Sequence, residues 1–181
     1  KLPDIEMKIL NPNNRKIGEI VVKGPNVMAG YYKDPVITAS CFTEDGWFRT
    51  KDLGYIDKKG NLYIKGRKDN MMVGSNGENI YPEEIEATIN EHDMVLESLV
   101  VNNKGKLIAM VHFNYEQIEK LHTFNDEAEV NLAKRVEEIK KELMEYVNDR
   151  VNKSSKILEI IEQPVPFEKT ATQKIKRYLY N

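Results

Sequence analysis

The fold of this chain is decided by residues 66–86, which read GRKDNMMVGSNGENIYPEEIE. Within them, Gly74 and Gly77 flank the pair Ser75-Asn76. Clusters of glycine and asparagine supply the positive φ angles that let a chain reverse and expose backbone N–H groups. The sequence therefore predicts a glycine loop here, at the junction between a β-rich part of the chain and a mixed part.

A helix is predicted directly after this loop, over residues 82–92. Pro82 and the glutamates that follow it suit the first turn of a helix, because proline fits there and acidic side chains interact favourably with the positive end of the helix dipole. Ile85, Ile89 and Met94 are spaced to face a core. A surface hairpin that leads into a helix is the open alternative to a functional loop.

The composition is that of an ordinary globular protein. The 181 residues include 31% charged and 40% hydrophobic side chains, with a formal net charge of −2. This balance gives no sign of disorder or of nucleic-acid binding, and no apolar run is long enough for a transmembrane segment. The length allows one complete domain together with part of another.

The single cysteine, Cys41, excludes a disulfide within the chain and fits a reducing compartment. No hydrophobic signal segment follows Lys1. We therefore expect a cytoplasmic protein, with peripheral attachment to a membrane left open. Because the first residue is not methionine, we expect the chain to be a piece of a longer protein.

The first third of the chain predicts short strands joined by tight turns, because apolar and charged residues alternate between Gly, Asn and Pro clusters. The expected elements are strands over 5–9, 17–23, 47–50, 54–57 and 62–65, and a short helix that ends at Ser40. So few helices would leave one face of a sheet bare. We therefore expect this segment to be part of a larger unit.

The rest of the chain predicts an independent domain of mixed α and β structure. Runs rich in β-branched residues over 96–101 and 107–113 are joined by Asn102-Asn103-Lys104-Gly105, a typical hairpin turn, and a third strand is expected over 157–163. One amphipathic helix is expected from about Asp126 to Val151, with an apolar face formed by Leu132, Val136, Ile139, Leu143 and Val147. Its charged face is interpreted as solvated, the alternative being a surface for a partner or a membrane.

The order Gly-Arg-x-Asp, glycine loop and Tyr-Pro-x-Glu-Ile-Glu within residues 66–86 resembles the hinge motif of the adenylate-forming superfamily of acyl-CoA ligases, luciferases and adenylation domains. Residues 18–32 are similar to the glycine-rich structural motif of that superfamily. The resemblance implies an α+β fold, in which residues 1–68 are the distal β-rich part of the large N-terminal domain. Residues 69–181 would then be the C-terminal lid, a mobile domain with a small sheet and helices.

Residues 47–52, Trp-Phe-Arg-Thr-Lys-Asp, resemble the ribose-binding motif of the superfamily. The resemblance implies that Asp52 accepts hydrogen bonds from both ribose hydroxyls of ATP, and an ionised carboxylate can indeed accept two donors at once. The alternative is that Asp52 only caps a turn before Leu53. Lys51 departs from the pattern, since many members have glycine at this position.

Residues 166–177, PFEKTATQKIKR, are similar to the terminal lysine motif of the superfamily, with Thr172-Gln173-Lys174 in place of the usual Thr-Gly-Lys. The resemblance implies that Lys174 is the catalytic lysine, which bridges the acyl carboxylate and the α-phosphate during adenylation. One flexible ammonium can stabilise negative charge that two reacting groups share. By itself, the basic tail would be interpreted as a solvated face or a general anion-binding patch.

The implied reaction has two halves, for which the substrates and cofactors are ATP, Mg²⁺ and coenzyme A. A carboxylate attacks the α-phosphorus of Mg²⁺-ATP, and the thiol of coenzyme A then displaces AMP from the acyl-adenylate. The lid would rotate about Asp69 between the two halves, Arg67 would contact ATP phosphate or ribose, and Gly74 and Gly77 would flank the path of the pantetheine arm. Without the motif, Asp69 would be interpreted as a surface carboxylate.

The phosphate loop of the superfamily and its adenine and acyl pockets are absent from these residues, so we expect the chain alone to be inactive and to need the missing N-terminal domain. No residue is assigned to a metal. The tail and the long helix look most like those of long-chain fatty acid–CoA ligases, while a shorter or aryl acid and an acyl carrier protein acceptor stay open. The alternative function is a free-standing regulatory or protein-binding module derived from such a lid.

Overall fold

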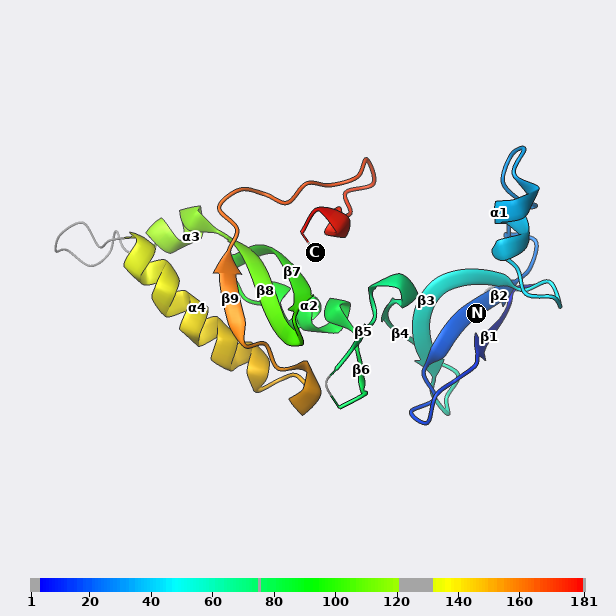
Figure 1. Ribbon diagram of the computed structural model, residues 1–181, viewed down its shortest axis with the longest axis horizontal. Helices are drawn as coiled ribbons and strands as arrows, with labels where there is room; N and C mark the ends of the chain where they lie inside the picture. The colour runs from blue at the N-terminus through cyan, green and yellow to red at the C-terminus, as the bar shows by residue number, and fades with distance from the viewer. Residues whose placement is uncertain (1–3, 75, 121–131, 181) are drawn as a thin grey trace. The chain divides into compact units, whose positions relative to one another are not determined.

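The computed structural model describes residues 4–74, 76–120 and 132–180 (Figure 1). The chain divides into two compact units, Lys1–Met71 and Met72–Asn181. Small sheets and a few helices make up both, which confirms the predicted α+β class.

The first unit is built on one antiparallel sheet with the strand order β1-β2-β3-β4. The strands are β1 (Glu6–Leu10), β2 (Gly18–Lys23), β3 (Phe48–Ile56) and β4 (Leu62–Arg67). The two strands predicted over 47–50 and 54–57 are one strand of nine residues, β3. The prediction was wrong there because an irregular stretch in the middle of β3 reads in the sequence like a break between strands.

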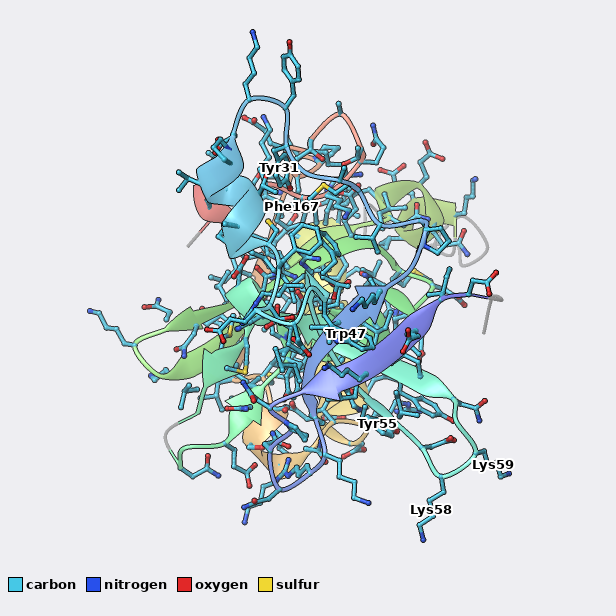
Figure 2. All side chains as sticks on the ribbon, turned by 90° about the vertical axis from the view of Figure 1, so that its right-hand side faces the viewer. Tyr31, Trp47, Tyr55, Lys58, Lys59 and Phe167 are labelled. Carbon is cyan, nitrogen blue, oxygen red and sulfur yellow. The ribbon has the colours of Figure 1, made fainter. Side chains whose placement is uncertain are left out.

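Turn chemistry in this unit follows the prediction. Asp57 accepts hydrogen bonds from the backbone N–H groups of Lys59 and Asn61, both at 2.8 Å, and these bonds hold the pKa of its carboxyl below the ordinary value. Lys58 and Lys59 point outward from the end of this β3–β4 turn (Figure 2). Helix α1 (Pro35–Ser40) begins where Asp34 accepts a 2.9 Å hydrogen bond from the N–H of Ile37, as an N-cap residue does.

The first unit has a small core. Among its described residues, the buried hydrophobic side chains are Ile17, Ile20, Val21 and Leu53. None of the six residues of α1 is buried, while Tyr32 beside it is 88% exposed. The sheet therefore buries little apolar surface within this unit.

The second unit opens with the short antiparallel pair β5 (Met72–Val73) and β6 (Asn79–Ile80), followed by α2 (Pro82–Asn90). The main sheet has the order β7-β8-β9, with β7 (Val95–Asn103) and β8 (Lys106–Phe113) forming the predicted hairpin. β9 (Glu159–Glu162) runs parallel to β8. Helices α3 (Tyr115–Lys120) and α4 (Leu132–Asn148) lie in the connection that makes this parallel pairing possible.

Helix α4 agrees with the predicted apolar spacing, since Val136, Ile139, Leu143 and Val147 are buried, while Leu132 is 37% exposed. The beginning predicted near Asp126 lies outside the described residues. Helix α3 was not predicted, because six residues with one buried position, Ile118, give too short a pattern to detect.

Both faces of the main sheet are covered. On one face, side chains such as Val100, Ala109 and Val111 join those of α2 and α4 in the larger core. On the other face, Leu99, Val101 and Ile108 pack around Phe167. This alternation along β7 and β8 means that the C-terminal segment, which follows β9, is the second cover of the sheet.

Candidate functional site

The proposed ribose-binding residue and the arginine before the hinge lie on neighbouring strands. Asp52 of β3 and Arg67 of β4 are direct partners across the antiparallel pair. Arg67 Nη1 donates to Asp52 Oδ1 at 2.6 Å and to the carbonyl oxygen of Thr50 at 3.1 Å. The guanidinium thereby orients the Asp52 carboxylate. The Asp52 side chain is 32% exposed, so solvent or a ligand can reach it.

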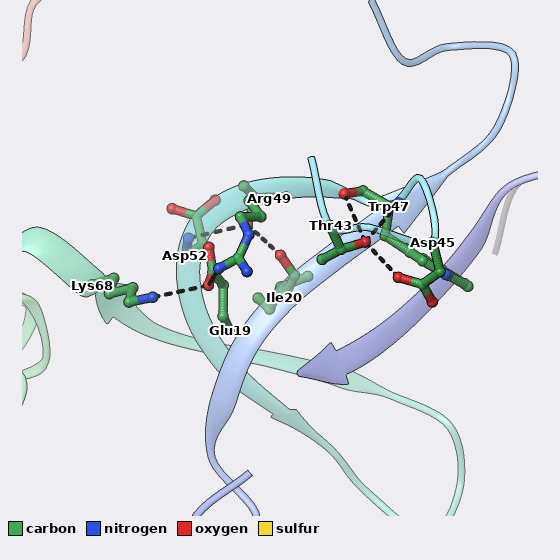
Figure 3. A network of polar contacts seen from close by, with 9 residues as sticks. Glu19, Ile20, Thr43, Asp45, Trp47, Arg49, Asp52 and Lys68 are labelled. Carbon is green, nitrogen blue, oxygen red and sulfur yellow. Dashed lines mark hydrogen bonds and ion pairs between the residues drawn. The ribbon is translucent and has the colours of Figure 1, made fainter. Parts of the chain in front are cut away.

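A β-bulge holds Asp52 in place. The register between β2 and β3 shifts so that Thr50, Lys51 and Asp52 lie opposite the single residue Ile20. Thr50 Oγ1 closes the bulge by donating to the carbonyl of Ile20 at 2.8 Å and accepting from the N–H of Asp52 at 3.0 Å (Figure 3). Bulges commonly re-aim a side chain beside a functional site. Asp52 lies inside a strand, so the alternative in which it caps a turn is wrong.

Lys51 adopts a φ of 61° in this bulge, which is the left-handed region. Glycine reaches that region without a steric penalty, and a lysine does so at a cost. The position at which the sequence departs from the glycine of the superfamily is therefore one where the backbone favours glycine.

The proposed hinge residue follows two residues that are tied to the sheet. Arg67 is held by Asp52, and Lys68 Nζ lies 3.0 Å from Glu19 Oε2, a carboxylate whose side chain is 6% exposed (Figure 3). Asp69 lies in the 3₁₀ turn Lys68–Asn70, and its carboxylate is 3.2 Å from Lys51 Nζ, with both side chains more than half exposed. Such an exposed ion pair contributes about 0–1 kcal/mol. Asp69 is thus held much less firmly than the two residues before it.

The predicted glycine loop is the turn of the β5–β6 hairpin. The N–H of Gly74 donates to the carbonyl of Glu78 at 2.8 Å, and the N–H of Gly77 donates to the carbonyl of Gly74 at 2.9 Å. Gly77 has a φ of 76°, which only glycine adopts freely. The expected exposure of backbone N–H groups therefore does not hold for these two glycines, and their contribution is a tight turn in which these two positions carry no Cβ atom. Ser75 lies outside the described residues.

Lys174 lies on a second hairpin, formed by the segment after β9. Lys169 and Ile175 form an isolated antiparallel bridge, and the N–H of Thr170 donates to the carbonyl of Lys174 at 2.8 Å. Gln173 has a φ of 61°, and a three-residue turn that ends in this conformation is a common hairpin type. The Lys174 side chain is exposed. A hydrogen-bonded turn therefore presents the exposed Lys174 side chain to solvent, with Gln173 again at a position that favours glycine.

The strand that enters this hairpin is fastened to the main sheet. Phe167 is 3% exposed, and its ring packs edge-on against that of Tyr180, with 5.0 Å between the ring centroids. Lys169 forms an ion pair with Glu97 of β7, and Glu97 also accepts a hydrogen bond from the N–H of Phe167 at 3.3 Å. The N–H of Glu168 donates to the hydroxyl of Tyr180 at 2.8 Å. The base of the hairpin is therefore fixed.

The structure thus brings Asp52, Arg67 and the neighbourhood of Asp69 together on the first unit. In the second unit, the Gly74–Gly77 turn and the Lys174 hairpin are separate and project in opposite directions in the view of Figure 1. The sequence interpretation missed the bulge and the Lys174 hairpin. The signal for both was the replacement of a motif glycine, by Lys51 and by Gln173.

No group of three or more His, Cys, Asp or Glu side chains that could hold a metal ion occurs among residues 4–74, 76–120 and 132–180. Over the same ranges, no helix is both long and apolar enough to cross a membrane.

Comparison with known proteins identifies related sequences. The family described as "AMP-binding enzyme C-terminal domain" matches residues 69–180. A sulfoacetate–CoA ligase of Cupriavidus necator is 51% identical over 86 residues, which are 48% of this chain and 17% of the relative. A 2-succinylbenzoate–CoA ligase of Bacillus cytotoxicus is 47% identical over 89 residues, which are 49% of this chain and 18% of the relative.

A solved structure agrees over nearly the whole chain. O-succinylbenzoate coenzyme A synthetase from Bacillus subtilis, in complex with AMP, superposes with a TM-score of 0.74 at 28% identity, covering 99% of this chain and 34% of that one. The chain therefore spans less than a fifth of the length of the two curated relatives in these alignments and about a third of the solved one.

Proposed function

The chain belongs to the AMP-binding enzyme family through its C-terminal domain, and on that premise we propose that it is the C-terminal part of an acid–CoA ligase. The proposed reaction joins a carboxylic acid to coenzyme A at the expense of ATP. The observation that carries the proposal is the hairpin that presents Lys174, because it combines a fixed backbone with an exposed cation.

In this proposal residues 1–68 are the distal β-rich part of the large N-terminal domain, and residues 69–181 are the mobile lid. The small core of the first unit supports the assignment. A unit built on a four-stranded sheet, with four buried hydrophobic side chains among its described residues, gains little stability by itself and gains more when a larger domain covers it.

The first half-reaction is assigned to Asp52, Arg67 and Lys174. The Asp52 carboxylate accepts hydrogen bonds that the ribose hydroxyls of ATP donate, while Arg67 fixes the carboxylate and faces ribose or phosphate. A carboxylate oxygen of the acid attacks the α-phosphorus, the bond to the β-phosphate breaks, and pyrophosphate leaves. The Lys174 ammonium stabilises the charge shared by the attacking oxygen and the α-phosphate. Mg²⁺ accompanies ATP, and no residue of this chain is given a role as its ligand.

The second half-reaction is assigned to the turn containing Gly74 and Gly77. The thiol sulfur of coenzyme A attacks the acyl carbon and releases its proton to solvent, the bond to the phosphate oxygen breaks, and AMP leaves. Gly77 adds no side chain to this turn, and nothing lies within 4 Å of the position that its Cβ would take, which leaves space for the pantetheine arm beside it. Because this turn and the Lys174 hairpin project in different directions, one rotation about Asp69 would exchange them at a single reaction centre.

The acid is proposed only as a carboxylic acid. The long-chain fatty acid suggested by the tail and by α4 has no counterpart in the relatives described above, which are named for sulfoacetate and 2-succinylbenzoate. Candidate acids for an assay therefore include these two together with fatty acids of several lengths.

The experiment that tests the proposal separates the two half-reactions in the protein that carries this chain with a complete AMP-binding domain. Lys174→Ala should lower acid-dependent ATP–pyrophosphate exchange about 10²–10³-fold, the loss expected for one transition-state stabiliser. Thioester formation from supplied acyl-adenylate should remain within about twofold, since Lys174 has no role there.

The matched control is Lys156→Ala, which removes an exposed lysine elsewhere in the second unit. It should leave both half-reactions unchanged. An equal loss of both half-reactions in Lys174→Ala would overturn the assigned role. Absence of acid-dependent exchange with every acid tested would favour the binding-module alternative.

A further inference from the structure

Glu86 connects three elements of the second unit. It lies on α2, and its side chain is 11% exposed. Its Oε1 atom accepts a 2.7 Å hydrogen bond from the N–H of Val100, which lies on the edge strand β7. Its Oε2 atom accepts a hydrogen bond from Arg177 Nη2 in an ion pair. The carboxylate thus satisfies a strand edge with one oxygen and holds the C-terminal segment with the other.

Arg177 is where the strand that leaves the Lys174 hairpin meets the body of the unit. It begins the 3₁₀ turn Arg177–Leu179, three residues after Lys174. Between them the N–H of Lys176 donates to the carbonyl of Glu168 at 2.8 Å, so the hairpin ladder extends almost to Arg177. With the entering strand fixed at Phe167, the anchor at Arg177 determines how the whole hairpin lies on the unit.

The ion pair between Arg177 and Glu86 is better explained by the orientation that it imposes than by a gain in the free energy of unfolding. Removing two charges from water costs several kcal/mol, and apolar replacements of such pairs are often as stable or more stable. The planar guanidinium instead matches the directions of the carboxylate oxygens and fixes one relative orientation. A small displacement of a reacting group can cost about 10²-fold in rate.

We propose that Arg177 and Glu86 are positioning residues for Lys174, which they hold in place for adenylation by fixing the exit strand of its hairpin to α2. This rests on the proposed function of Lys174. Neither residue contacts a substrate in the proposal. Since α2 also follows directly from the Gly74–Gly77 hairpin, the same ion pair connects the Lys174 hairpin to the helix that this hairpin precedes.

The test uses Arg177→Gln in the protein that carries a complete AMP-binding domain. The kcat of adenylation should fall about tenfold. This loss is smaller than the 10²-fold cost of a full displacement, because the strand that enters the hairpin stays fixed at Phe167. The KM for ATP should change less than twofold, since nucleotide-binding residues lie on the other unit. Thioester formation from supplied acyl-adenylate should be unchanged, and Arg177→Lys should recover part of the lost rate.

A double variant distinguishes positioning from a separate role. If Arg177 acts only through Lys174, then Lys174→Ala with Arg177→Gln should be no slower in adenylation than Lys174→Ala alone. Additive losses would overturn the proposal. A normal adenylation rate in Lys174→Ala itself would instead overturn the proposed function, so the two failures can be told apart.

Two further variants guard against loss of folding. Glu86→Gln keeps an oxygen for the N–H of Val100 and removes one of the two carboxylates that pair with Arg177. It should slow adenylation less than Arg177→Gln does, because Glu83 Oε1 still lies 4.0 Å from Arg177 Nη2. The control is Arg150→Gln. It removes an arginine whose guanidinium carbon lies 3.6 Å from the centre of the Tyr146 ring, and Tyr146 is on α4. It should leave adenylation unchanged.

In the 181-residue chain, amide exchange at Lys174 and Lys176 should accelerate in Arg177→Gln and not in Arg150→Gln. Unchanged exchange at both amides would overturn the proposal.

Discussion

Arg67 and Asp52 are bound to each other across β3 and β4, with 2.6 Å between Nη1 and Oδ1. Each is assigned to ATP in the proposed mechanism, and the structure joins the two sequence motifs that carry them through one ion pair. The arginine also reaches the carbonyl of Thr50, which belongs to the bulge that carries Asp52. Loss of either partner should therefore affect the same step.

Asp52→Asn should raise the KM for ATP about tenfold to a hundredfold, because hydrogen bonds to a charged group are worth about 1.5–3 kcal/mol. Arg67→Ala should raise it in the same direction, and the double variant should be less than additive. Steady-state kinetics of pyrophosphate exchange would measure all three. Glu44→Gln, which neutralises an exposed carboxylate of the same unit, is the control and should change nothing. An unaltered KM in Asp52→Asn would remove this residue from the ATP site.

The prediction for the proposed hinge at Asp69 concerns the backbone and not a side-chain contact. Asp69→Pro should leave adenylation measurable and block thioester formation, since proline fixes φ at the residue proposed to absorb the rotation. Asp69→Asn removes the charge that pairs with Lys51 and keeps the backbone free, so it should support both half-reactions. Single-turnover measurement of each half-reaction decides the matter. Normal overall turnover in Asp69→Pro would exclude Asp69 as the pivot.

The backbone conformation of Gln173 predicts that the shape of the side chain at this position affects stability. Its φ of 61° is tolerated by glutamine and strongly disfavoured for a β-branched residue. Gln173→Val should therefore lower the free energy of unfolding by about 1–2 kcal/mol, or distort the hairpin and slow adenylation. Gln173→Gly should retain activity with a stability change below about 1 kcal/mol, because relief of strain is offset by greater freedom of the unfolded chain. Urea unfolding and pyrophosphate exchange would test both, and a Val variant equal to the native protein would contradict the turn assignment.

Sequence reasoning succeeded where a local pattern has a local cause. The spacing of Val136, Ile139, Leu143 and Val147 predicted a buried helix face, and the Asn-Asn-Lys-Gly run predicted the β7–β8 hairpin. It failed where the cause lies elsewhere in the chain. The bulge in β3 depends on pairing with Ile20, and single-strand patterns do not contain that pairing.

The same distinction applies to the candidate site. Motif order singled out Asp52, Arg67 and Lys174, whose roles stay predictions, and Gly74 and Gly77 predicted the turn of the β5–β6 hairpin. Nothing in the local sequence indicated that Glu86 would bind Arg177, since both are charged residues on segments that would be interpreted as solvated. Their burial arises only when α2, β7 and the C-terminal segment come together.

Glu86 also predicts a dependence of stability on pH. Burial raises the pKa of its carboxyl above the ordinary value of 4.5, against the opposing effects of Arg177 and the Val100 N–H. A raised pKa means that the folded state binds the proton more tightly than the unfolded state. The stabilising contribution of this proton is therefore complete below pH 4.5 and is lost as the pH rises through the raised pKa.

Urea unfolding of the native chain and of Glu86→Gln across this window measures the contribution. The free energy of unfolding of the native chain relative to that of Glu86→Gln should increase as the pH falls toward 4.5. A difference that is independent of pH, or that changes in the opposite direction, would show that the ion pair with Arg177 outweighs burial at this carboxyl.

The anchors of the Lys174 hairpin join parts of the chain that are far apart in sequence. Arg177 and Glu86 are separated by 91 positions, and Lys169 and Glu97 by 72. Contacts of such separation close large loops and form late, after the local helices and hairpins. During synthesis, the hairpin leaves the ribosome after α2 and β7, the surfaces on which it docks. If Lys174 acts as proposed, the hairpin that carries it would take its place only after α2 and β7 have formed, and adenylation would then depend on completed folding of this unit.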